Sequence, residues 1–299
     1  MWSGNARPRV NSSLRLPLRS RRSLAAGANV IRQRFRDVLL EALGDFEARN
    51  QWTEGELQSW MIRLRAALES ELPTDEQTRA ELEKWLGAVF RRDVHGRGIA
   101  KRVPGVSRYT LDHLAPSLRA ELDRRIFAGV GLIKLNKRAA TDKTLQRFAG
   151  WISSQPAGRR PAAKIREVAK EIAKPAAQVR YEARRVAIDQ GHKLSAAVAH
   201  VVAQGNGALA AIWHDRGQYD HGYDARKEHL ARSGKMFFVR NSWAMEQGLV
   251  KRGGPYIDEM EQVAELPFCS CWYEYVTHPD DLPEDRLTEK GREFVKGAA

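Results

Sequence analysis

Residues 213–239 read WHDRGQYDHGYDARKEHLARSGKMFFV, and residues 267–276 read PFCSCWYEYV. The first stretch holds three histidines, and the second holds both cysteines of the chain. The apolar run 236–239 and the aromatic, β-branched run 268–276 predict two strands of one small sheet. A short helix is predicted over 224–232, because Gly234 follows it where a helix C-terminus favours positive φ. We therefore expect an α+β module around these residues.

Two cysteines and one histidine of this module have the chemistry of a zinc site. Cys269 and Cys271 are two residues apart, so a strand would direct both sulfurs to one face. Thiolates and imidazoles are common Zn²⁺ ligands in proteins, so together with His229 they predict a structural zinc. The fourth ligand would come from His214, His221 or Asp224. The alternative is that the cysteines pack as small apolar residues and His229 bonds a backbone carbonyl.

The same residues resemble the Mu F-like minor head proteins of tailed bacteriophages, also called head morphogenesis proteins. The resemblance covers roughly residues 179–276. It begins with an Arg/Ala-rich helix over 181–203. The motif residues are Trp213, Asp224, Arg226, His229, Gly234 and Pro267, followed by Cys269 and Cys271.

The resemblance implies a low-copy virion component without catalytic turnover. Such a protein would bind the portal or the inner capsid protein and aid head assembly, genome packaging or DNA delivery. It would be made in the host cytoplasm and reside in the head interior or portal region. We expect no enzyme, because the chain has neither the H-E-x-x-H nor the G-x-S-x-G spacing.

Two other classes of protein remain open. A metal-dependent DNA-processing or toxin-like enzyme would use the His, Asp and Glu residues between 214 and 229. A helix-turn-helix regulator would use the predicted helices over 162–185 to bind DNA.

Basic residues concentrate in two zones of a chain whose net charge is +13. The first 36 residues hold arginines and no acidic residue, and residues 134–185 are also strongly basic. Two such zones predict nonspecific contact with the phosphates of double-stranded DNA. The alternatives are a solvated basic surface and, for the N-terminus, a transit peptide. The expected DNA contacts are Arg15, Arg19, Arg21, Arg22, Arg159, Arg160, Lys164, Arg166, Arg180, Arg184 and Arg185.

Hydrophobic periodicity predicts a mainly α fold, a helical bundle followed by a short mixed or antiparallel sheet. The first predicted helix covers residues 24–49, and the second begins at a Thr53–Glu56 capping box. We expect these two and the next helix to pack together. Further helices are expected over 112–128, 141–152, 162–173 and 176–203. No apolar run is long enough to span a membrane. The expected parts are a flexible basic arm over 1–23, a helical domain over 24–154, an α+β module over 162–276 and a polar tail over 277–299.

Overall fold

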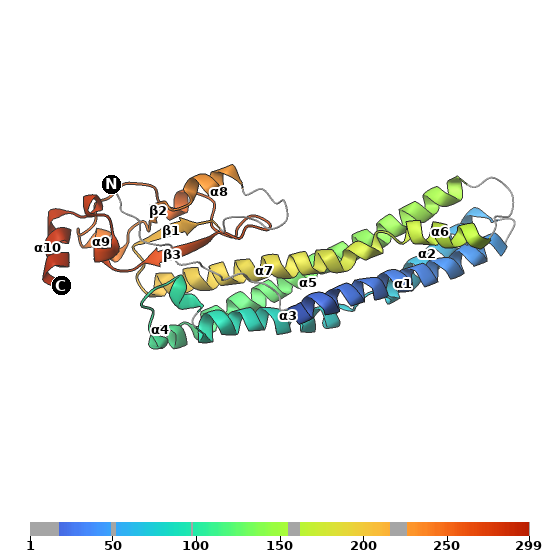
Figure 1. Cartoon of the computed structure of the whole chain (residues 1–299), viewed down its shortest axis with the longest axis horizontal. Coiled ribbons are helices and arrows are strands. Elements are labelled where there is room, and N and C mark those ends of the chain that lie inside the picture. The colour runs from blue at the N-terminus through green and yellow to red at the C-terminus, as the bar shows by residue number, and fades with distance from the viewer. Residues whose placement is uncertain (1–17, 49–51, 97, 155–161, 216–225, 299) are drawn as a thin grey trace. The chain divides into compact units, whose positions relative to one another are not determined.

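The computed structural model describes residues 18–48, 52–96, 98–154, 162–215 and 226–298. The described chain is mainly helical and has a three-stranded antiparallel sheet near its C-terminus, which confirms the predicted fold class (Figure 1). Among these residues, no helix combines the length and apolar character needed to cross a bilayer.

The chain forms two compact units that interleave in sequence. The first unit contains the described residues of 18–72 and 136–182, and the second contains those of 73–135 and 183–298. Helices α5 (Ala115–Ser153) and α7 (Ala176–Gly205) contribute residues to both. This division differs from the predicted succession of a 24–154 domain and a 162–276 module, because α5 and α7 each pass from one unit into the other, at residues 135/136 and 182/183.

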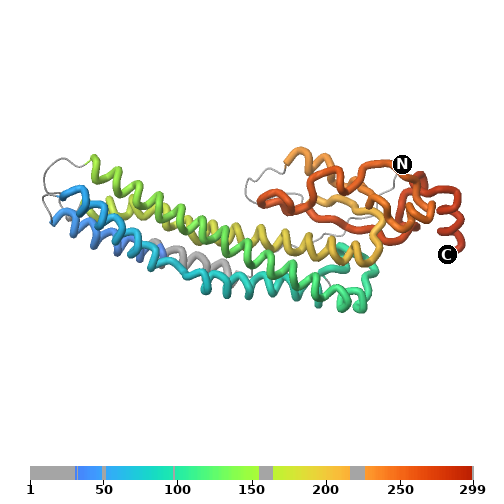
Figure 2. The backbone as a smooth tube through the Cα atoms, turned by 180° about the vertical axis from the view of Figure 1, so that it is seen from behind, coloured from blue at the N-terminus to red at the C-terminus, as the bar shows by residue number. Residues whose placement is uncertain are grey.

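The first unit is built around α1 (Leu18–Ala48), which packs against α2 (Glu54–Ser70) and α6 (Ala162–Ile172). Helices α1 and α2 run side by side in both ribbon views (Figures 1 and 2). Helix α2 begins with the predicted capping box, in which the Glu56 N–H donates to Thr53 Oγ1 and the Thr53 N–H donates to Glu56. Residues 18–23, expected in a flexible arm, are instead the first turns of α1. The core residues are Phe35, Leu39, Leu43, Trp60, Leu64, Leu68, Leu145, Phe148 and Ile172.

Helix α3 (Asp75–Phe90) belongs to the second unit and not, as expected, to a bundle with the first two helices. Glycines of two other helices explain this packing. A Cβ on Gly129 of α5 would lie 3.0 Å from Leu82 of α3. A Cβ on Gly191 of α7 would lie 2.5 Å from the Trp85 ring. Helix α3 therefore packs closely against α5 and α7.

A single α5 replaces the two helices predicted over 112–128 and 141–152. The intervening segment has no proline, so nothing in it removes a helical hydrogen bond. The short helix α4 (Arg108–His113) precedes α5 and is capped by Ser107, whose Oγ accepts from the Thr110 N–H.

The sheet has the strand order β2–β1–β3, with β1 (Ala210–His214) between β2 (Met236–Phe238) and β3 (Trp272–Val276). Trp213 pairs with Tyr273 across β1 and β3. The segment between α3 and α4 contacts the outer edge of β3, since the Tyr275 N–H donates to the Arg102 carbonyl at 2.7 Å.

The residues after the sheet are part of the second unit's core and are not the polar tail that was expected. Leu282 and Leu287 are buried in one cluster with Leu249 and Phe238. The Thr288 N–H also bonds the Leu249 carbonyl. Helix α9 (Trp243–Glu246), which lies between β2 and β3, and the C-terminal α10 (Glu289–Ala298) also contribute residues to this cluster.

A candidate metal centre

His229, Cys269 and Cys271 meet inside the second unit, as the sequence predicted. His229 lies on α8 (Lys227–Arg232), and both cysteines immediately precede β3. The His229 Nδ1 atom is 3.6 Å from Cys269 Sγ and 3.4 Å from Cys271 Sγ. Each residue is at most 4% exposed, so the donor atoms are sealed from solvent.

Backbone geometry brings these distant segments together. Gly234 has the predicted positive φ of 76° and its N–H donates to the Trp213 carbonyl, which returns the chain from α8 to the sheet. Arg226, at the start of α8, donates to the Pro267 carbonyl at 3.1 Å. Phe268 has a left-handed φ of 61°, and its N–H bonds Asp189 of α7. The cysteines therefore reach His229 from a turn and not from the predicted strand.

Glu261 sets the orientation of the His229 ring. His229 Nε2 lies 2.7 Å from Glu261 Oε1, so we assign the Nε2 proton to this hydrogen bond. The Nδ1 lone pair then points at the two sulfurs. A carboxylate on the outer nitrogen is the usual partner of a histidine that ligates a metal.

The spacing of the donor atoms fits Zn²⁺. Zinc–sulfur bonds of about 2.3 Å and zinc–nitrogen bonds of about 2.0 Å at a tetrahedral angle place sulfur and nitrogen about 3.5 Å apart. The two observed separations, 3.6 Å and 3.4 Å, agree with this value. The described residues thus bring together three candidate zinc ligands at distances compatible with the ion.

The two thiols differ in acidity. The pKa of Cys269 is lowered to about 6, chiefly by a hydrogen bond from Cys271 and further by backbone N–H groups and by His229. The pKa of Cys271 is raised far above its usual range, because it donates that hydrogen bond and is buried beside a charged neighbour. The hydrogen bond between the two sulfurs therefore favours a single thiolate in the pair near neutral pH.

Aromatic rings enclose the site. The Trp213 ring is fully buried and meets the His229 ring edge-on at 5.2 Å. Tyr273 packs edge-on against the same indole at 5.5 Å, and the Arg232 guanidinium lies over it at 5.1 Å. These side chains limit the access of water to the three candidate ligands. The predicted structural role of Trp213 is therefore to enclose the site.

The one described residue among the predicted fourth ligands, His214, is not brought to the site. His214 follows Trp213 in β1 and faces the other side of the sheet, where it stacks on Trp272 and bonds Glu274 at 2.9 Å. The prediction that His214 is a ligand was therefore wrong. His221 and Asp224 lie outside the described residues. The partner of His229 is the Glu261 carboxylate and not the backbone carbonyl of the alternative prediction. The sequence did not indicate Glu261, because no spacing rule links residues 32 positions apart.

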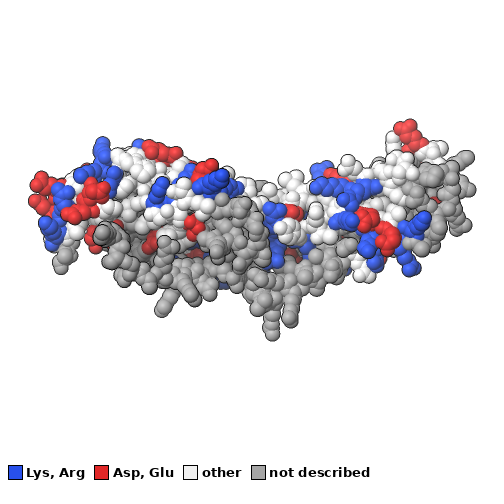
Figure 3. Space-filling model, turned by 45° about the horizontal axis from the view of Figure 1, so that its top comes forward, with Lys and Arg blue, Asp and Glu red and all other residues white. Residues whose placement is uncertain are grey.

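The predicted DNA contacts do not form one described patch. Arg15, Arg159 and Arg160 lie outside the described residues, and the side chains of Arg19, Arg21 and Arg22 on α1 are not described. Lys164 and Arg166 are exposed on α6, while Arg180, Arg184 and Arg185 of α7 are half-buried. Arg185 lies over the Phe268 ring at 4.1 Å. Figure 3 shows basic and acidic side chains interspersed on the face that it draws.

Comparisons of this chain with protein-family models, curated proteins and solved structures give no match. The function is accordingly inferred from the residues and the geometry of the site.

Proposed function

We propose that this protein is a non-enzymatic minor head component of a tailed bacteriophage, with a C-terminal module held together by Zn²⁺. The supporting observation is that the residues of the Mu F-like resemblance converge on one buried centre. Trp213 packs on His229, Gly234 bonds Trp213, and Arg226 bonds the turn that carries Cys269 and Cys271.

The proposed ion would have a structural role. Zn²⁺ bound by His229, Cys269 and Cys271 would join α8 to a segment about forty residues further along the chain, closing a long loop. Burial of all three ligands favours this role over turnover, which needs a position open to substrate. The fourth position would be filled by a water or by a residue outside the described set.

The proposed place of the protein is the head interior, bound to the portal or inner capsid protein and in contact with DNA. Its net charge of +13 supports nonspecific attraction to phosphates. Mass spectrometry of purified heads from the source phage should detect the chain in a few copies. Heads that contain portal protein but lack this chain would contradict the assignment.

Metal analysis tests the zinc centre. Full-length protein purified under reducing conditions should hold about one zinc per chain, and the His229→Ala variant should hold none. His214→Ala is the matched control, because His214 follows Trp213 in β1 but faces the other side of the sheet. Zinc retained by His229→Ala, or no zinc uptake by the unaltered protein, would overturn the proposal.

A plasmid assay separates the structural role from a DNA-processing enzyme. We expect supercoiled plasmid to remain intact with Mg²⁺, Mn²⁺ or Zn²⁺. Nicking that disappears in His229→Ala would favour the enzyme, and strong preference for one duplex over random DNA would favour the regulator.

A further inference from the structure

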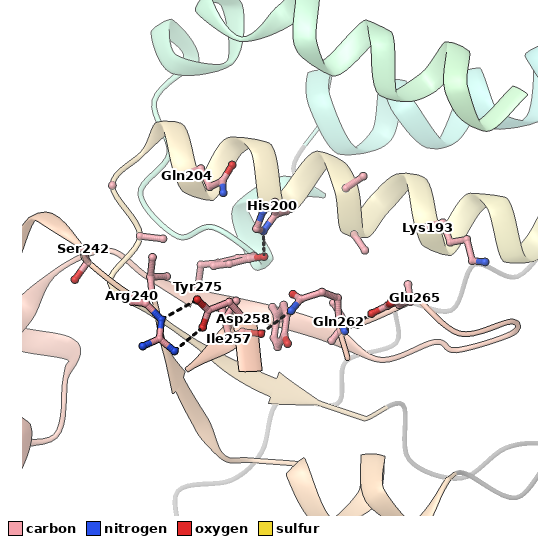
Figure 4. A pocket seen from close by; sticks show the side chains of 18 of the residues that line it. Lys193, His200, Gln204, Arg240, Ser242, Ile257, Asp258, Gln262, Glu265 and Tyr275 are labelled. Carbon is pink, nitrogen blue, oxygen red and sulfur yellow. Dashed lines mark hydrogen bonds and ion pairs between the residues drawn. The ribbon is translucent and has the colours of Figure 1, made fainter. Parts of the chain in front are cut away.

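A cavity of about 960 Å³ lies in the second unit, separate from the three candidate zinc ligands (Figure 4). Helix α7, strand β3 and the segment 257–265 supply most of its walls. Small side chains on α7, Ala196 and Ala197, leave room on one wall, and Val263 and Ala264 add apolar surface. A cavity of this size accommodates an organic molecule larger than a few waters.

Two buried hydroxyl groups on the cavity lining have no hydrogen-bond partner among the described residues. Tyr273 is 2% exposed and its Oη is unpaired. Ser242 is 6% exposed and its Oγ is also unpaired. A buried hydroxyl without a partner destabilises the fold, so such groups usually meet a water or a ligand.

The cavity also has positive charge that its own acids do not neutralise. Arg125 lines it. Its Nη2 atom lies 3.9 Å from Glu121 Oε2, and its buried Nε finds no acceptor among the described residues. Burial lowers the pKa of Arg125, and Glu121 and Asp189 only partly oppose this shift. The carboxylate of Asp258, by contrast, is occupied by Arg240 at 2.8 Å and 3.2 Å.

The remaining polar groups on the lining are neutral or engaged. His200 and Tyr275 turn toward one another in Figure 4, with Nδ1 and Oη 3.3 Å apart. Glu265 accepts the Gln262 N–H at 2.7 Å. Lys193 lies 3.2 Å from Asp189 and adds a second cation to the lining. The unfilled hydrogen-bonding capacity is thus mostly that of donors.

We propose that this cavity binds an organic anion with a ring-sized apolar body. Arg125 would pair with the anionic group, and Tyr273 would donate its unpaired hydroxyl to a second acceptor atom. The apolar body would pack on Ala196 and Ala197. The observations that support this site do not include the proposed zinc or the phage role, although Tyr273 also packs against Trp213.

Two fluorescent probes with the same aromatic body test the charge requirement. 8-Anilino-1-naphthalenesulfonate carries an anion, and N-phenyl-1-naphthylamine lacks it. The full-length protein should bind the sulfonate at one saturable site, and Arg125→Gln should weaken this binding about tenfold. Binding of the neutral probe should change less than twofold. Arg124→Gln, at an exposed neighbour outside the cavity lining, is the matched control.

Two further variants test the location. Tyr273→Phe should weaken sulfonate binding about fivefold without lowering the melting temperature of the free protein, because the lost hydroxyl has no partner. Ala197→Phe should fill the cavity and abolish binding of both probes. Absence of saturable binding, or equal binding by the Arg125, Tyr273 and control variants, would overturn the proposal. If Ala197→Phe fails to fold, the comparison of Arg125→Gln with Arg124→Gln tests the proposal.

Discussion

The imidazole of His229 bonds the carboxylate of Glu261 at 2.7 Å through Nε2, which leaves Nδ1 facing two sulfurs. Three elements meet in this arrangement: α8, the segment before β3 and the loop that carries Glu261. The carboxylate fixes the ring and its tautomer before any ion binds.

Removal of this carboxylate should weaken zinc binding without abolishing it. We expect Glu261→Ala to lower zinc affinity about 10–100-fold, because the imidazole loses its orientation and some of its basicity. Competition with a chromophoric chelator measures the change. Glu284→Ala, at an exposed acid of the same unit, should leave affinity unaltered. Equal affinities in the two variants would show that Glu261 does not support the site.

Alanine substitution at two glycines on neighbouring helices should change the free energy of unfolding in opposite directions. Gly191→Ala should destabilise the second unit by about 1–3 kcal/mol, because the new methyl group would meet the Trp85 ring at 2.5 Å. Gly131→Ala on α5 has open space and should stabilise by up to about 1 kcal/mol through helix propensity. Urea unfolding of both variants checks the pair. A neutral Gly191→Ala would mean that α3 and α7 are not in close contact.

The stability of the second unit should fall as the pH drops below about 6.5. Burial lowers the pKa of His200 from its usual 6.5, and Glu121 of α5 only partly opposes this effect. The unfolded chain therefore takes up a proton that the folded chain refuses, from about pH 6.5 down to the folded pKa. The groups around His200 are Tyr275 of β3, which burial keeps neutral, and the cations Arg125 and Lys193 on the same cavity lining.

Replacement of the histidine tests this assignment. His200→Gln should reduce the loss of unfolding free energy between pH 7 and pH 5, measured by urea denaturation at each pH. His278→Gln, at an exposed histidine of the same unit, should not reduce it. Identical pH profiles for the wild type and His200→Gln would refute the role of this side chain.

DNA binding should depend on the exposed cations of α6. Each neutralised phosphate contributes about −0.9 to the slope of log affinity against log salt, so Lys164→Ala with Arg166→Ala should reduce the slope by about two. Fluorescence anisotropy with random duplex DNA at several salt concentrations measures this slope. The control, Lys290→Ala with Lys296→Ala on α10, removes two exposed cations of the second unit. Equal effects of both pairs would indicate general electrostatic attraction and no surface on α6.

Local signals in the sequence anticipated much of the structure. The Thr53–Glu56 capping box, the positive φ of Gly234 and the helices over 162–203 all depend on neighbours within a few residues. Residue chemistry also anticipated the grouping of His229 with the two cysteines. These predictions succeeded because caps, helical periodicity and ligand type are encoded locally.

The sequence by itself thus determined the fold class, most helices and the three candidate zinc ligands. Only the tertiary structure decided that α5 and α7 run through two units, that His214 faces away from His229 and that Glu261 bonds it. It also decided that Tyr273 and Arg125 line one cavity. The physical reason is that such relationships depend on which faces pack together across long stretches of chain, and no local period or spacing specifies that choice.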